Sequence, residues 1–200
     1  MSTTVVVILV VAAVVIVALV AVLLMQQTRR RHLKEKFGPE YERAVREKES
    51  PREAERELAE REKRHKELDI KPLSASARER YTQRWALIQE QFVDRPSGAL
   101  TEADRVLGEL MAERGYPTDG GYEQQAADLS VRHARTLEHY RAAHDTLSEH
   151  ERSQASTERL REAMVRYRTV FEDLLTDGAD DRHQHNGHRD KAQHADEQRR

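Results

Sequence analysis

The chain has 200 residues, of which 35% are charged and 5% aromatic, and its formal net charge is −2. Because acidic and basic residues nearly cancel, the strongly basic surface of a nucleic-acid-binding protein is not expected. The lack of cysteine excludes disulfides, thiolate metal sites and a cysteine nucleophile. A chain of this length is expected to form one folded domain with an anchor and tails.

The first predicted element is an apolar segment, residues 5–25, which follows a short N-terminal segment, residues 1–4. Every residue in it is Val, Ile, Leu, Ala or Met. As a helix it would span about 31 Å, which matches the hydrocarbon core of a bilayer. No charge precedes it at Ser2, Thr3 or Thr4, and no small-x-small cleavage site follows it. We therefore expect a retained transmembrane signal anchor and not a cleaved signal peptide.

Basic residues predict how this helix is oriented. Since Lys and Arg near a span are retained on the cytoplasmic side, we expect a single-pass protein of the cell membrane with a cytoplasmic body. The same cations could hold anionic lipid headgroups, although a topology signal alone accounts for them. The basic residues, all after the apolar segment, are Arg29, Arg30, Arg31, Lys34 and Lys36.

Residues 26–70 alternate basic residues with Glu and contain few apolar side chains. We expect this charged helical stalk to bury no core by itself. Gly38-Pro39 should interrupt the helix that leaves the membrane, because proline lacks an amide donor and disfavours a helical conformation in the residue before it.

A second stalk helix is predicted from Pro51 to about residue 68. Ser50 and Glu53 have the spacing of a capping box, with Pro51 as the first helical residue. Two interpretations remain open for this helix: a solvated spacer, or a coiled coil that binds a partner or a second copy. The coiled-coil seam would consist of Ala54, Leu58, Arg61, His65 and Leu68, of which two are polar.

Residues 71–176 are predicted to form a small antiparallel helical bundle, so that the whole chain is all-α. Apolar residues recur at helical spacing in four stretches, and no stretch alternates as a strand would. The inward residues are Ala77, Tyr81, Trp85, Ile88 and Phe92; Ala103, Val106, Leu107, Leu110 and Met111; Tyr122, Ala126, Leu129, His133, Leu137, Tyr140, His144 and Leu147; and Leu160, Met164, Tyr167, Phe171 and Leu174.

Local signals predict where the four helices begin and end. Ser74 and Ser156 are the expected N-caps of the first and last helices. The second helix is expected at about residues 99–114, after a break over residues 94–98 that contains Pro96 and before a stop at Gly115. The third is expected to run as one helix over residues 122–151, with Ser130 as a candidate kink.

Two features of the bundle raise the question of a ligand site. The first is a pair of histidines on the inner face, His133 and His144, which lie about 16 Å apart by helical rise. This is too far to share one metal ion, so we expect hydrogen-bonded core or boundary residues. The second is an aromatic stripe, for which core packing is the preferred interpretation. It consists of Tyr81, Trp85, Phe92, Tyr140, Tyr167 and Phe171.

Residues 177–200 contain no large apolar residue and are predicted to be a disordered tail. Flexible imidazole and carboxylate groups can chelate Zn²⁺, Ni²⁺ or Cu²⁺, and a solubilising tail is the alternative interpretation. The candidate metal ligands are His183, His185, His188 and His194.

Several short segments, matched in order between about residues 30 and 175, resemble an uncharacterised actinobacterial family. Its members are usually labelled only as membrane or secreted proteins. The resemblance implies a single-span helical protein, supplies no activity, ligand or catalytic residue, and leaves the tail outside. The matching segments are Phe37-Gly38-Pro39-Glu40-Tyr41, residues 55–62, Arg114-Gly115-Tyr116-Pro117, residues 126–130 and residues 155–158.

No sequence motif of a nucleotide-binding loop, serine hydrolase, zinc protease or EF-hand is present. We therefore expect neither an enzyme nor a bound cofactor, and no nucleic acid as partner. The predicted function is that of a membrane-anchored interaction or scaffold module with an unidentified protein partner or a second copy of itself. The alternative is a ligand- or metal-binding module that uses the bundle interior or the His-rich tail.

Overall fold

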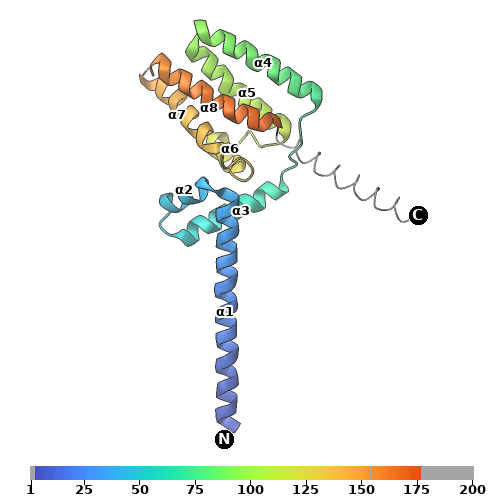
Figure 1. Cartoon of the computed structure of the whole chain (residues 1–200), viewed down its shortest axis with the longest axis vertical. Coiled ribbons are helices and arrows are strands. Elements are labelled where there is room, and N and C mark those ends of the chain that lie inside the picture. The colour runs from blue at the N-terminus through green and yellow to red at the C-terminus, as the bar shows by residue number, and fades with distance from the viewer. Residues whose placement is uncertain (1–2, 154, 177–200) are drawn as a thin grey trace, which may run out of the picture. The chain divides into compact units, whose positions relative to one another are not determined.

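The computed structural model describes residues 3–153 and 155–176, and these residues form eight α-helices and no strand (Figure 1). The predicted all-α class is therefore confirmed. The described residues divide between Glu60 and Arg61 into two compact units. The predicted tail, 177–200, lies outside the described residues.

The apolar segment forms part of one long helix, α1 (Thr3–Phe37). Its stretch Ala12–Phe37 is long and apolar enough to cross a membrane, by length and composition. The helix continues without interruption through the basic residues and ends at Phe37. There Gly38 has a φ of +46°, which glycine adopts without strain, and Pro39 begins the next helix. The predicted break is confirmed.

Two shorter helices follow α1 in the first unit, α2 (Pro39–Glu47) and α3 (Pro51–Glu67). The Glu53 amide donates to Oγ of Ser50 at 3.3 Å, as the capping prediction requires. α3 ends within one residue of its predicted end.

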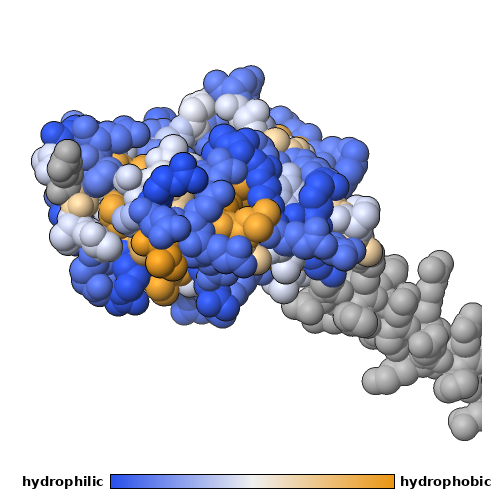
Figure 2. Space-filling model, turned by 90° about the horizontal axis from the view of Figure 1, so that it is seen from above, coloured by the Kyte–Doolittle hydropathy of each residue, from blue (hydrophilic) through white to orange (hydrophobic). Residues whose placement is uncertain are grey.

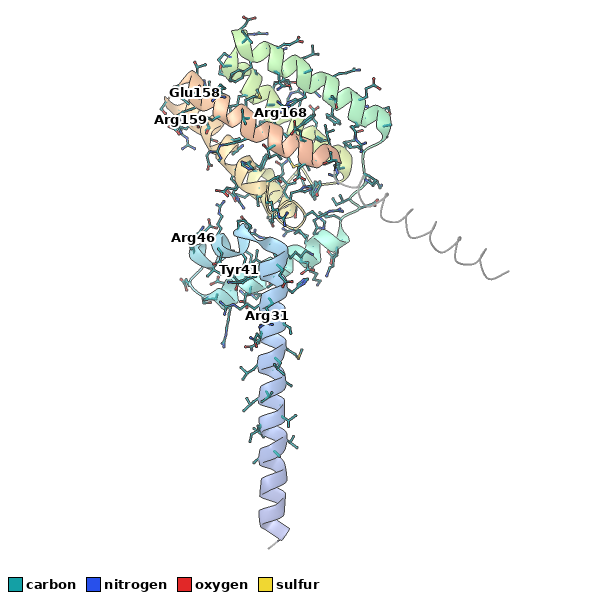
Figure 3. The ribbon with its side chains drawn as sticks, viewed as in Figure 1. Arg31, Tyr41, Arg46, Glu158, Arg159 and Arg168 are labelled. Atoms are coloured by element: carbon teal, nitrogen blue, oxygen red, sulfur yellow. The ribbon has the colours of Figure 1, made fainter. Side chains whose placement is uncertain are left out.

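The end of α1 packs against α2 and α3, so the expectation that residues 26–70 bury no core is wrong. Tyr41 ties the three helices together: its hydroxyl donates to Oε1 of Glu55 at 2.8 Å and accepts from Nε of Arg30 at 3.2 Å. Figure 3 labels Tyr41 at this junction. A few apolar residues are enough to form this core because all three helices contribute side chains to the same place. We call this packed region the juxtamembrane unit because it follows the predicted membrane span; its core residues, all at most 4% exposed, are Leu33, Phe37, Tyr41, Ala44, Ala54 and Leu58.

The second unit is a bundle of five helices, where the sequence predicted four. Ser74 accepts from the Ala77 amide at 3.1 Å and Ser156 accepts from the Arg159 amide at 3.4 Å, which confirms both predicted N-caps. The helices are α4 (Ala75–Asp94), α5 (Pro96–Arg114), α6 (Gly121–Leu129), α7 (Leu137–Ser153) and α8 (Thr157–Thr176).

The fifth helix arises because the predicted helix over residues 122–151 is interrupted after Leu129, at the candidate kink Ser130, and resumes only at Leu137. Its apolar pattern continues across the interruption, but polar side chains of this segment hydrogen-bond elsewhere. Oγ of Ser130 donates to the Ala127 carbonyl at 2.5 Å, and Oγ1 of Thr136 donates to Asp173 of α8 at 2.5 Å. Such bonds compete with the helical backbone and favour turns over residues 130–136.

The start of α5 also differs from the prediction, since the helix begins at Pro96 and not near residue 99. The proline was taken as part of a break, yet at the first helical position it costs no hydrogen bond. The end of α5 is as predicted: Gly115 has a φ of +97°. A Cβ on Gly115 would lie 2.4 Å from the Asp69 carbonyl oxygen, so this stop also requires glycine for close packing.

The bundle core lies between α4, α5, α7 and α8, with α5 and α8 in the middle (Figure 1). Trp85 of α4 is 4% exposed and stacks on Phe171 of α8, with 4.4 Å between ring centroids. The aromatic stripe is core, as predicted, although Phe92 is only partly buried at its edge.

Candidate interaction surface

The bundle interior contains a cluster of polar side chains around Asp104 of α5. The Tyr167 hydroxyl donates to Oδ1 of Asp104 at 2.6 Å, and Nδ1 of His144 lies 3.5 Å from the same oxygen. The His144 ring stacks on the Tyr122 ring, with 3.8 Å between centroids and 7° between planes. One carboxylate thus connects α5, α7 and α8, and the stacked ring adds α6.

Burial keeps the phenols of this cluster protonated. Desolvation and the negative charge of Asp104 raise the pKa of Tyr167 and of Tyr140, and desolvation raises the pKa of Tyr122 to about 12. The Tyr140 hydroxyl donates to Oε1 of Gln125 at 3.2 Å. Because these groups bind one another, their arrangement serves the packing of the helices.

His133 belongs to a different polar contact. Its side chain is buried, and its Nδ1 lies 2.8 Å from Oδ2 of Asp173, the same carboxylate that accepts from Thr136. His133 and His144 therefore pair with separate aspartates, and the structure does not bring them together. Both are hydrogen-bonded core or boundary residues, as the sequence predicted.

No group of three or more metal-ligating side chains lies together within residues 3–153 and 155–176. The predicted ligands of the tail lie outside the described residues, so the metal site stays a prediction. They are His183, His185, His188 and His194.

A groove lies between α4 and α5. Ile88 and Ala99 give it an apolar floor, since they are 2% and 1% exposed. Gly98 adds no side chain there, and Leu87 lines the groove while remaining 56% exposed. We call this surface the α4–α5 groove; its lining residues are Arg84, Leu87, Ile88, Gln91, Arg95, Gly98, Ala99, Glu102 and Arg105.

Ion pairs hold two guanidinium groups of the groove in place. Arg84 donates to Oε1 of Glu102 at 3.0 Å and also pairs with Glu109. Arg105 donates from Nε to Oε2 of Glu102 at 2.8 Å and pairs with Glu109 as well. The hydrogen bonds from Arg105 lower the pKa of Glu102, so the network is ionised at neutral pH. Both guanidinium groups are therefore paired within the chain.

The third guanidinium group of the groove, that of Arg95, is different. It is exposed, and no side chain in the described part of the chain pairs with it. Arg95 is also the residue before α5, and its side chain makes no capping hydrogen bond to that helix. An uncompensated cation therefore lies beside the positive end of a helix dipole.

One strongly exposed apolar side chain of the bundle belongs to this groove. Figure 2 shows apolar areas interrupted by hydrophilic residues on the face that it presents. In the described residues after α1, the strongly exposed large apolar side chains are Leu87, Val93 and Val165, at 56%, 84% and 52%. Of these three, Leu87 lines the α4–α5 groove.

This groove was not predicted from the sequence. Leu87 lies outside the predicted core stripe of α4, and its apolar side chain at an otherwise polar position was the available signal. Arg95 and Gly98 were assigned to a break between helices, whereas the structure places Gly98 within α5.

No protein-family model, curated protein or solved structure matches this chain. The resemblance to an actinobacterial family therefore stays a prediction, and the surface described above is the basis for a functional proposal.

Proposed function

We propose that this chain is a single-pass protein of the cell membrane whose cytoplasmic helical bundle binds a protein partner through the α4–α5 groove. In this proposal the molecule is a membrane-tethered interaction or scaffold module. The observation that carries it is the exposed Leu87 in a groove whose arginines are already fixed by ion pairs, apart from Arg95. A groove with an apolar floor and an unpaired cation at its edge offers a partner both apolar contact and a charged anchor.

The membrane part of the proposal rests on α1. Its described apolar side chains are exposed all round the helix, for example Ile16, Leu23 and Met25 at 60%, 62% and 71%. A helix with this composition and length gains free energy by entering a bilayer. The basic residues that follow the apolar segment support a cytoplasmic body through the positive-inside rule.

Binding is favoured over catalysis by the way in which the polar groups are used. The Asp104 cluster and the pair of His133 with Asp173 are engaged in contacts between helices. A reactive site would instead direct such groups into a cavity toward a substrate. For the same reason the bundle interior gives little support to the alternative of a small-molecule site.

Site-specific photocrosslinking in the native membrane tests the proposal. A photoreactive residue replaces Gln91, which is exposed and lines the α4–α5 groove. Gln89 is the matched control, because it is exposed on the same helix but two residues away, so it points to a different side. We expect a discrete crosslinked adduct from position 91 and none from position 89.

Equal adducts from the two positions, or none from either, would refute partner binding at the groove. The topology is tested separately in the same membranes. Protease added outside intact protoplasts should leave the body uncut, and cleavage of the body would reverse the proposed orientation.

A further inference from the structure

The chemistry of the α4–α5 groove specifies the kind of partner it fits, and this step rests on the proposed function. Three arginines and one glutamate line the groove. Glu102 is already shared between Arg84 and Arg105, whereas the Arg95 guanidinium has no counterion in the described part of the chain. The complementary group on a partner is therefore a carboxylate next to Arg95.

The apolar part of the groove adds a second requirement. Leu87 and Gln91 of α4 and Arg95, the residue that caps its C-terminus, follow one another at intervals of about one helical turn, so this row is about 12 Å long. Leu87 contributes an exposed apolar side chain at one end of the row, and Arg95 contributes a cation at the other. A partner that covers the row needs an apolar side chain and an acidic one roughly two turns apart.

A helix meets both requirements because residues at i, i+4 and i+8 lie along nearly one line. The open position at Gly98 allows close approach, since a Cβ built there would meet no atom nearer than 4.0 Å. We infer that the α4–α5 groove binds an acidic amphipathic helix of a partner protein, with apolar side chains on Leu87 and Ile88 and a carboxylate on Arg95.

Nucleic acid is the other polyanion that arginines attract, and the groove is less suited to it. Glu102 lies in the lining and Glu109 beside it, so phosphates along the groove would meet carboxylates as well as guanidinium groups. Of the three groove arginines, only Arg95 lacks a carboxylate partner in the described residues, so the groove offers one available cation where a nucleic-acid backbone needs several in a row.

The test uses the full chain in nanodiscs of zwitterionic lipid and three fluorescent probes. The first is a helix-forming peptide of leucine and glutamate with leucines along one face. The second has lysine in place of every glutamate, and the third is a single-stranded oligonucleotide. Empty nanodiscs give the blank for binding to lipid, and fluorescence anisotropy gives the affinity.

We expect saturable binding of the leucine-glutamate peptide, weaker binding in high salt, and no binding of the lysine peptide. Arg95→Glu and Leu87→Ser should each weaken the affinity about tenfold, because each removes one of the two anchors. The matched controls are Arg135→Glu and Val93→Ser, which change an exposed arginine and an exposed valine outside the groove lining. These controls should leave the affinity unchanged.

Tighter binding of the lysine peptide or of the oligonucleotide would overturn the acidic-helix assignment. The same conclusion would follow if the control variants weakened binding as much as the groove variants. All four substitutions are at exposed positions, and unchanged thermal unfolding would exclude misfolding as a cause. A crosslink at Gln91 that persists when the peptide fails would retain the proposed function and reject only this partner class.

Discussion

The juxtamembrane unit and the bundle are both built from charged helices, yet they gain their stability in different ways. The juxtamembrane unit buries a few side chains, and the hydrogen-bonded Tyr41 holds its three helices together. The bundle buries a continuous core that extends over α4 to α8 and adds polar contacts such as that of Tyr167 with Asp104. Helices this polar can therefore pack into units of different size, and we expect the two units to unfold separately.

The largest expected effect is that of Trp85→Ala in the bundle. The Trp85 ring is 4% exposed and stacks on Phe171, so its removal leaves a cavity between α4 and α8. We expect the free energy of unfolding of the bundle to fall by about 3 to 5 kcal/mol. Urea unfolding of the full chain in detergent, followed by helical circular dichroism, measures the loss.

Leu87→Ala on the same helix is the control for Trp85→Ala, because Leu87 is exposed and its truncation should change stability by less than about 0.5 kcal/mol. A loss below about 1 kcal/mol for Trp85→Ala would place the ring outside the energetic core. The bundle would then lack the large core contribution that distinguishes it from the juxtamembrane unit.

Leu58→Ala should act on the juxtamembrane unit alone. Leu58 is fully buried in a core of few residues, so its truncation should cost about 2 to 3 kcal/mol there. Hydrogen exchange measured by segment should then show lost protection in α2 and the first half of α3. Protection in α5 and α8 should be unchanged, and Arg56→Ala, an exposed substitution on α3, should change neither region. Equal loss of protection in both regions would mean that they unfold as one.

Arg64→Ala tests where the bundle begins along the chain. Asp128 of α6 has a fully buried side chain that accepts from Nε of Arg64 at 3.1 Å and from Nε2 of Gln124 at 2.8 Å. Losing one partner of a buried carboxylate should cost the bundle about 1 to 3 kcal/mol. Lys63→Ala, one residue earlier in α3, should have no measurable effect. An unchanged bundle in Arg64→Ala would favour the predicted domain limit at residue 70.

Much of the helical layout was predictable because it depends on residues that are close in the sequence. Ser74 and Ser156 cap their helices through amides three residues ahead, and Gly38 and Gly115 end helices by their own conformation. These signals act locally, so the sequence reveals them directly.

The features that could not be predicted from the sequence depend on contacts between residues far apart in the chain. The turn between α6 and α7 is stabilised by a hydrogen bond from Thr136 to Asp173, 37 residues away, so the apolar pattern alone indicated one helix. The core of the juxtamembrane unit needs α1 and α3 to meet. The α4–α5 groove likewise exists only once Leu87 and Gly98 are brought together by packing.

The smallest expected effect compares the N-caps of the two regions. Ser74 accepts from the Ala77 amide at 3.1 Å, and Ser50 accepts from the Glu53 amide at 3.3 Å. Ser74→Ala and Ser50→Ala should each cost about 1 kcal/mol, whereas the glycine variants should cost only a few tenths. The first loss should appear in the unfolding of the whole bundle, because α4 belongs to its continuous core.

The loss from Ser50→Ala should appear only in hydrogen exchange of the first turns of α3, since the juxtamembrane unit is expected to open by itself. If Ser50→Ala lowers the free energy of unfolding of the bundle as much as Ser74→Ala does, the whole of α3 unfolds together with the bundle. The two regions would then behave as one cooperative structure. The two caps make the same kind of hydrogen bond and differ only in the region to which they belong. A difference between the two variants therefore reports whether each region unfolds by itself, and not how strong the hydrogen bond is.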